Sequence, residues 1–370
     1  MSVALRCSAC GATYALAAPL PWRCEKCTGL LDLAEPLRYD AAGVDARRPG
    51  LWKYRSSFGL PDDLQPVSMG EGNTPLVDAT IDGQTVYFKL DYLMPTGSYK
   101  DRGTTVLVSV LVHLGIEEAV EDSSGNAGAS FAAYAARTGR LRARIFVPER
   151  ASAGKLAQMA AFGARLEKVP GPRSKASEAV QAAAASGVTY ASHNYLPLGS
   201  LGLATAAFEI VEQLGGAAGT VVLPVGHGSN FVGLWRGFKA LQAAGVIGSL
   251  PQMVGVQAEA CAPLWAVWRF GLDGLGFVTE GETLAEGIRS VRPVRGDASL
   301  RVAHESGGGF VTVNEVQIDG GRNALGRMGF YVEHTSAVVW AGVRQVLAEG
   351  RPGPVVVVLT GSGLKQTPVG

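Results

Sequence analysis

Four of the five cysteines lie in two pairs near the start of the chain. Cys7 and Cys10 form one CxxC motif, Cys24 and Cys27 form a second, and 13 residues separate the two motifs. Each motif fits a tight turn that aims two thiolates at one point, and two such turns complete a tetrahedral S4 site. The spacing predicts a zinc-ribbon-like segment over residues 1–34, which Zn²⁺ would help to fold. A redox CxxC, or cysteines without a metal, is the alternative interpretation.

A lysine inside a turn of small and hydroxyl residues is the second group that could do chemistry. The turn reads PTGSYKDRG over residues 95–103, and an apolar helical pattern begins within it. The positive end of a helix disfavours the ammonium form of a nearby lysine, so Lys100 is a candidate amine nucleophile. A lone lysine is usually a solvated surface charge, but the whole string favours a functional role.

Three further turns of this kind each follow a strand-like run. Residues 123–128 read SSGNAG and precede an alanine-rich helical pattern, where backbone N–H groups would suit a carboxylate. Residues 226–230 read GHGSN and predict a phosphate cradle, and residues 360–363 read TGSG, where a hydroxyl could bond a heteroaromatic nitrogen. Each motif alone is explained equally well by an ordinary cap or turn. Only their combination is specific.

The elements that must position these turns alternate between short β-type runs and helical stretches from about residue 66. We predict strands at 85–90, 119–122, 144–147, 165–169, 189–191, 220–225, 253–257 and 355–359, and helices at 102–114, 126–138, 155–162 and 175–185. Strands one helix apart indicate parallel sheets with helices on both faces, and such sheets bind ligands beyond the carboxyl ends of their strands. The predicted fold class is therefore α/β with two doubly wound parallel-sheet lobes.

Composition excludes several function classes. The 370 residues are 47% hydrophobic, enough for a substantial core, and the net charge is only +1. This charge offers no basic field for a nucleic acid or an anionic membrane, and the apolar runs are too short to span a bilayer. We therefore expect no nucleic-acid or membrane partner. The start of the chain has no signal-peptide pattern, which predicts a cytoplasmic protein.

Taken together, the turns resemble those of fold type II pyridoxal-phosphate enzymes, and specifically of the threonine synthase family. The strings that carry the resemblance are EGNTPL at 71–76, PTGSYKDRG at 95–103, SSGNAGAS at 123–130, PVGHGSN at 224–230 and LTGSGLK at 359–365. The resemblance spans residues 66 to about 366. A cysteine-rich N-terminal segment also occurs in some members of the family.

The resemblance implies roles for individual residues. Lys100 would bind pyridoxal 5′-phosphate as a Schiff base and shuttle protons, Asn126 would bond the ring oxygen of the cofactor, and Thr360 would face its pyridine nitrogen. The cofactor phosphate would be held by Gly226, His227, Gly228, Ser229 and Asn230, and the carboxylate of an amino-acid substrate by Ser123, Ser124 and Ala127. The cofactor would act as the electron sink for the reaction.

The resemblance also implies a domain organisation. Residues 66–103 and 196–370 would form the large cofactor-binding lobe, and residues 104–195 a small mobile lobe that closes over the substrate. Residues 35–65, rich in Pro, Asp, Arg and Gly, would link this body to the zinc-ribbon-like segment. The expected assembly is a homodimer.

The segment of residues 191–205 departs from the threonine synthase pattern. Relatives often carry an arginine and a Gly-Gln-Lys-Thr run there, which help to bind the phosphate of the substrate, and this chain has neither. Each charge-assisted donor is worth about 1.5–3 kcal/mol, so O-phosphohomoserine would need replacement donors. The candidates are Lys155, Arg289, Arg292 and His193.

Three functions are open at this point. The leading hypothesis is a threonine synthase-like lyase that converts O-phosphohomoserine to threonine and phosphate. The runner-up is a β-elimination or β-replacement enzyme, similar to serine/threonine dehydratases or cysteate synthase, which the apolar residues 196–204 favour. The third is a non-catalytic regulator on an enzyme scaffold, and the presence of Lys100 argues against it.

Overall fold

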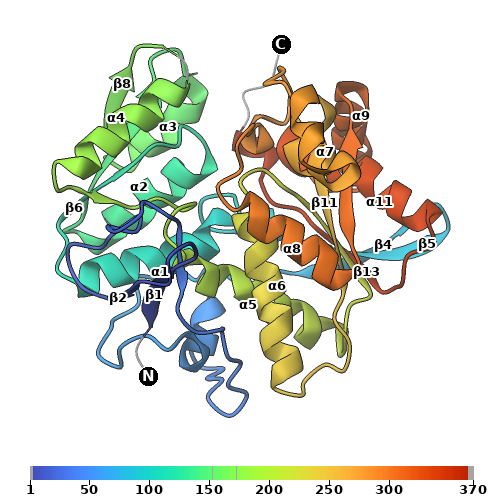
Figure 1. Cartoon of the computed structure of the whole chain (residues 1–370). Helices are drawn as coiled ribbons and strands as arrows, with labels where there is room; N and C mark the ends of the chain where they lie inside the picture. Colours follow the sequence, from blue (N-terminus) through green and yellow to red (C-terminus); the bar gives the residue numbers. More distant parts are fainter. Residues whose placement is uncertain (1–2, 152, 172, 366–370) are drawn as a thin grey trace. The chain divides into compact units, whose positions relative to one another are not determined.

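The computed structural model describes residues 3–151, 153–171 and 173–365, with the side chains of residues 153–155 excepted. The described chain divides into two compact units (Figure 1). Unit 1 contains residues 3–72 and 100–202, and unit 2 contains residues 73–99 and 203–365. These borders lie a few residues from the predicted lobe borders at 103/104 and 195/196. The predicted mobility of the small lobe stays a prediction.

Unit 1 is built around a four-stranded parallel sheet. Its strand order is β8 (Arg165–Val169), β7 (Arg142–Pro148), β6 (Glu118–Glu121) and β9 (Thr189–Tyr190). The chain passes from strand to strand through α2 (Asn126–Thr138), α3 (Ala153–Ala161) and α4 (Arg173–Ala185), and α1 (Lys100–His113) precedes the sheet. This is the predicted alternation of strands and helices, and α2 and β8 have the predicted bounds.

Both faces of this sheet are buried. Val120 of β6 and Phe146 of β7 pack with Ala176 and Val180 of α4. The neighbouring Ile145 points to the opposite face because side chains alternate along a strand, and it is fully buried as well. The helices that flank the sheet therefore cover it on both sides, as in doubly wound folds.

Residues 35–65, predicted to be a linker, contribute to the core of unit 1. The 3₁₀ helix η1 (Gly50–Phe58) buries four large side chains, namely Leu51, Trp52, Tyr54 and Phe58. The indole N–H of Trp52 donates to Glu71 Oε1 at 3.0 Å and to Thr105 Oγ1 at 2.9 Å. Buried polar groups need such partners, so these bonds fix the segment against α1.

Unit 2 contains a six-stranded sheet. Its order is β12 (Gly309–Val313), β11 (Gln252–Ala258), β10 (Thr220–Pro224), β13 (Val355–Val358), β5 (Gln84–Lys89) and β4 (Leu76–Ile81). The first five strands are parallel, as predicted for the four that the sequence analysis identified; β12 was not predicted. The edge strand β4 is antiparallel to β5, which corrects the expectation of a purely parallel sheet. A two-residue turn at Asp82 and Gly83, with φ of 49° and 79°, closes this hairpin.

Helices cover both faces of this sheet too (Figure 1). On one face, Val311 and Val313 of β12 pack in a cluster with side chains of α9 (Glu315–Arg327) and α11 (Val339–Ala348). On the other, Phe310 contacts Phe231 of α6 (Ser229–Ala243) and Trp268 of α7 (Pro263–Phe270). Helices α5 (Gly199–Leu214), α8 (Gly296–Ser306) and α10 (His334–Ala337) complete the layers.

None of the helices in the described residues is both long and apolar enough to cross a bilayer.

Candidate active site

The part of the lysine turn that precedes Lys100 is fixed to the residues that follow the last strand of unit 2. The backbone N–H of Tyr99 donates to the carbonyl of Thr360 at 2.9 Å, and that of Ser362 donates to the carbonyl of Gly97 at 2.9 Å. Lys100, the next residue along the chain, is the first residue of α1, and its side chain is partly exposed. The prediction that the lysine starts a helix is confirmed.

The SSGN loop connects β6 to α2 in unit 1. Asn126 is the first residue of α2, as predicted, so the N–H groups of its first turn lack partners within the helix. Ala127 is buried, whereas Ser124 and Asn126 are partly exposed. Gly128 lies so close to the carbonyl of Ser123 that a Cβ there would clash with the backbone. The loop therefore presents a helix N-terminus with hydroxyl groups, a suitable site for a carboxylate.

An acidic cluster that sequence reasoning missed lies directly before this loop. Glu121, the last residue of β6, is 1% exposed, and its Oε1 is 2.6 Å from Nδ1 of His193. Burial raises the pKa of Glu121 to about 7 and lowers the pKa of His193 well below its usual value. Asp122 accepts a hydrogen bond from the hydroxyl of Tyr190 at 2.7 Å. The sequence did contain a signal for this cluster, because Glu121 and Asp122 are adjacent at the carboxyl end of a predicted strand.

The GHGSN loop of unit 2 has the form of an anion cradle. It follows β10, and α6 begins at Ser229, so it lies at a helix N-terminus as predicted. Gly228 has a φ of 90° and lies against Ser299 and Arg295, where a side chain would not fit. His227 is held to the following segment, because its Nδ1 accepts the N–H of Val294 at 3.3 Å.

Two buried polar side chains of unit 2 support the assignment of a polar ligand. The side-chain amide of Asn230 is 5% exposed, and neither its Nδ2 nor its Oδ1 has a partner among the described residues. The hydroxyl of Ser98 is likewise buried without one. Buried polar groups are rarely left unsatisfied. A phosphate against the first turn of α6 would give the Nδ2 of Asn230 an acceptor, so these residues fit pyridoxal phosphate.

Sheet topology brings several predicted residues to one edge within each unit. In unit 2, β10 and β13 are adjacent and parallel, so the GHGSN loop and Thr360 follow strand ends at the same edge. Thr360 is buried, and its N–H donates to Ser336 Oγ at 2.9 Å. In unit 1, β6 and β9 are adjacent, which places the SSGN loop beside His193.

The proposed replacement donors for a substrate phosphate are scattered. Arg289 lies 3.7 Å from Glu280, Arg292 is exposed, and His193 is bonded to Glu121. The side chain of Lys155 lies outside the described residues. Within unit 1, His193 lies beside the SSGN loop, whereas Arg289 and Arg292 belong to unit 2.

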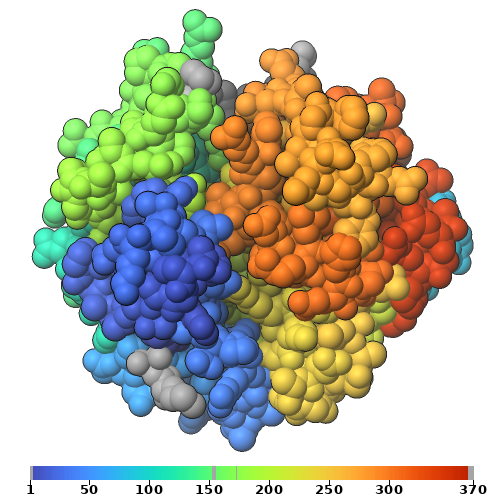
Figure 2. All heavy atoms as spheres, viewed as in Figure 1, coloured from blue at the N-terminus to red at the C-terminus, as the bar shows by residue number. Residues whose placement is uncertain are grey.

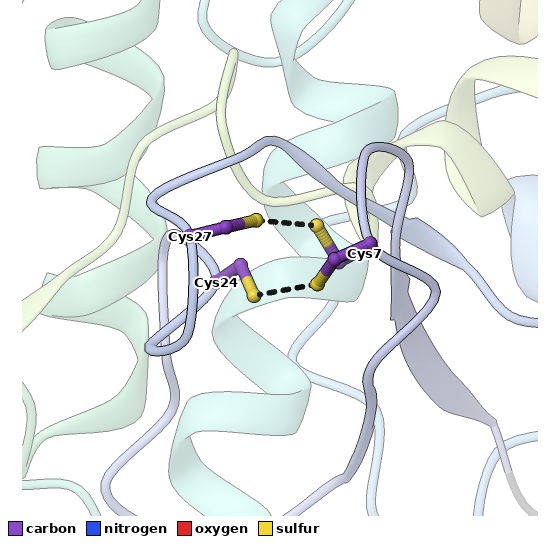
Figure 3. Close-up of side chains that lie close together, drawn as sticks. Cys7, Cys24 and Cys27 are labelled. Atoms are coloured by element: carbon purple, nitrogen blue, oxygen red, sulfur yellow. Dashed lines mark hydrogen bonds between the residues drawn. The ribbon is translucent and has the colours of Figure 1, made fainter.

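The four N-terminal cysteines come together in unit 1. Their sulfur atoms all lie within 4.8 Å of one another, with Cys7–Cys27 and Cys10–Cys24 at 3.5 Å (Figure 3). Cys7 ends β1 (Ala4–Cys7), which pairs with β2 (Thr13–Ala15) and β3 (Leu31–Leu33) in a small antiparallel sheet. A tetrahedral Zn–S4 site has sulfurs about 3.8 Å apart. The geometry therefore fits the donor set that the sequence predicts.

The N-terminal segment also contacts the loop that carries His193. The guanidinium group of Arg23 lies 4.7 Å from the ring of Tyr195 and donates to its hydroxyl at 2.9 Å. Trp22 makes edge contacts with the rings of Tyr190 and Tyr195 at 5.3 and 5.1 Å. The cysteine cluster is thus anchored on the side of unit 1 where β9 ends.

Comparison with known proteins agrees with this fold. The family described as pyridoxal-phosphate dependent enzyme matches residues 67–361. A threonine synthase of Methanocaldococcus jannaschii is 34% identical, over 98% of this chain and 92% of that protein. A threonine synthase of Mycobacterium tuberculosis is 35% identical, over 85% of this chain and 87% of that protein. The crystal structure of a T.th. threonine deaminase superposes with a TM-score of 0.65 at 25% identity, covering 80% of this chain and 94% of that one.

The fold and the family match define a pyridoxal-phosphate-dependent lyase of fold type II. Within that class, the chain belongs to the threonine synthase family. The resemblance seen in the sequence motifs is therefore confirmed.

Proposed function

We propose that this chain is a threonine synthase that converts O-phosphohomoserine to threonine and phosphate, with Lys100 as the residue that binds the cofactor covalently. The observation that carries the proposal is the position of Lys100 at the start of α1, directly after a segment bonded to the end of β13. Threonine synthases from several organisms share 32–35% identity with most of this chain, which supports the choice of substrate.

Residues of the other three turns would divide the remaining tasks. Gly226, His227, Gly228, Ser229 and Asn230 would hold the cofactor phosphate, Asn126 and Thr360 would contact the cofactor ring, and Ser123, Ser124 and Ala127 would bind the substrate carboxylate. Bound pyridoxal phosphate supplies an electron sink for the bond cleavages. The ε-amine of Lys100 would take the α proton of the substrate and return a proton later in the reaction, as a general base and then a general acid. Closure of the small lobe would exclude water.

A specific observation favours a second candidate, the β-elimination or β-replacement enzyme. Leu196, Leu198 and Leu201, in the segment that departs from the family pattern, are all buried. Glu121 and Asp122 lie beside the SSGN loop and would repel a dianionic phosphate when ionised. An amino acid with an uncharged side chain, such as serine or threonine, would suit these surroundings better than a phosphoester.

A side-by-side assay separates the two candidates. If the first is right, protein loaded with pyridoxal phosphate releases threonine and inorganic phosphate in equal amounts from O-phosphohomoserine. If the second is right, O-phosphohomoserine is inert, and serine or threonine yields a keto acid and ammonia instead. Heat-denatured protein with the same cofactor is the control, since free pyridoxal phosphate catalyses such reactions slowly. Activity on neither class of substrate would overturn both proposals.

We also propose that the four cysteines bind one structural Zn²⁺ ion. The hydroxyl of Tyr14, 3.1 Å from Cys24 Sγ, lowers the pKa of that thiol to about 6, which favours the thiolate that zinc requires.

The purified protein is expected to contain one zinc per chain by plasma mass spectrometry. Cys10→Ser is expected to lose the metal and to make residues 4–33 protease-sensitive. The matched control is Cys261→Ser, which should keep it. Full zinc content in Cys10→Ser would contradict the site.

We also propose that the protein is cytoplasmic and forms a homodimer. Exposed apolar side chains after α7 in unit 2 offer a surface that a second copy could cover: Leu272 is 77% exposed, Phe277 78% and Phe270 52%. Helix α7 and its neighbours form the light orange part of the surface in Figure 2. Contiguous apolar side chains of this kind typically mark an interaction surface.

A further inference from the structure

Glu121, which is buried, and His193, which is partly exposed, form a pair that the proposed mechanism does not yet use. Both carboxylate oxygens of Glu121 have partners, because Oε1 is bonded to His193 Nδ1 and Oε2 accepts the N–H of Ser123. Ser123 is the first residue of the SSGN loop. The pair therefore connects the end of β9 to the loop proposed to receive the substrate carboxylate, and any change in its charge acts on that loop.

Charged groups from three elements face this pair. Lys100 at the start of α1 and Arg173 at the start of α4 both favour the ionised form of Glu121, and both lower the pKa of His193. Asp122, the residue that follows β6, acts in the opposite direction on His193, and its own carboxyl is bonded to Tyr190 of β9. Lys100 is the only one of these groups to which we assign a change of charge during the reaction.

Because the two side chains share a hydrogen bond, the pair gains or loses a single proton as a whole. Because the pKa of His193 lies well below its usual value, its ring stays neutral near pH 7. When Glu121 is protonated, its carboxyl donates to Nδ1 and the ring carries its hydrogen on Nε2. When Glu121 is ionised, it accepts from Nδ1–H, and Nε2 becomes an acceptor. Loss of one proton thus switches the tautomer of His193.

We propose that Glu121 and His193 are positioning residues that form a proton store beside Lys100. The store takes up one proton from solvent when Lys100 loses its positive charge and releases it when that charge returns. The net charge beside the SSGN loop then stays nearly constant through the proton transfers at Lys100. This inference rests on the proposed role of Lys100. The side chain of His193 is 18% exposed, which gives the proton a path to solvent.

A purely structural role is the competing explanation, and a titration tests it without turnover. The full-length protein, labelled with ¹⁵N in its five histidines, is titrated by NMR, and His193→Asn assigns the resonances of His193. We expect Nε2 to change from protonated to unprotonated with a midpoint near Glu121's pKa of about 7. Lys100→Ala should move this midpoint upward, because the positive charge at Lys100 that favours ionised Glu121 is gone. Lys168→Ala, an exposed lysine of unit 1, should leave it unchanged.

Two outcomes of this titration would overturn the proposal. One is a single tautomer of His193 throughout the pH range, and the other is the same midpoint in wild type and in Lys100→Ala. Neither result depends on which substrate the enzyme uses, so the proton store and the proposed function can fail separately.

The pH dependence of turnover gives a second readout. Proton uptake requires a deprotonated store, so wild-type kcat should fall as the pH decreases through about 7. Glu121→Gln keeps the size of the side chain but removes its titration, and this limb of the profile should disappear. A structural role predicts instead that Glu121→Gln lowers kcat by the same factor at every pH, which would sink the proposal.

Discussion

The Lys100→Ala variant is expected to lose at least ~10³-fold in kcat while the chain still folds. General acid–base catalysis by one side chain typically contributes 10²–10⁴-fold, and the loss of covalent attachment adds to this. Lys100 opens α1 and is partly exposed, so alanine, the best helix former, should not disturb the helix. Steady-state kinetics on the substrate identified above measures the loss, and circular dichroism checks the fold.

A matched lysine and a chemical label make this test specific. Lys168→Ala removes an exposed lysine of unit 1 and should retain wild-type kcat. Borohydride reduction of the loaded protein, followed by mass analysis of peptides, should add the cofactor to the peptide that contains Lys100 and to no other. A label on a different lysine, or full activity in Lys100→Ala, would remove the basis of the proposed mechanism.

Local signals in the sequence predicted much of the fold and the placement of the site turns. Asn126 and Ser229 start α2 and α6 directly after glycine-containing turns, and Gly139, with φ of 66°, ends α2. Such caps depend on residues within a few positions of each other, so a single sequence reveals them. The parallel order of the predicted strands followed because a helix separates each of them from the next.

Features that depend on distant residues could not be predicted in this way. Glu121 and His193 are 72 residues apart, and neither has a local pattern that identifies its partner. Trp52 finds its partner Thr105 across 53 residues, which is why a Pro- and Asp-rich stretch was interpreted as a linker although it packs in a core. The Asp82-Gly83 turn was a local signal for the antiparallel edge strand that the sequence analysis did not use.

Removing one partner of the buried ion pair between Lys89 and Glu209 is expected to destabilise unit 2 strongly. Their charged atoms are 2.7 Å apart, and the side chains are 0% and 1% exposed. Lys89 Nζ also donates to the carbonyl of Thr74 at 2.7 Å, and Glu209 Oε1 accepts the N–H of Asn73 at 2.8 Å. The pair therefore joins β5, α5 and the segment that precedes β4.

Glu209→Gln should lower the free energy of unfolding by about 3–5 kcal/mol, because the ammonium group of Lys89 would stay buried without its counter-charge. Urea titration followed by circular dichroism measures this change.

The control is Asp82→Asn, which breaks a 2.8 Å pair with Arg344 in the same unit. Both of its side chains are about half exposed, so the loss should stay below ~1 kcal/mol. The double variant Lys89→Met/Glu209→Gln removes both charges and should recover part of the loss. If Glu209→Gln unfolded at the same urea concentration as Asp82→Asn, burial of the pair would not govern its contribution.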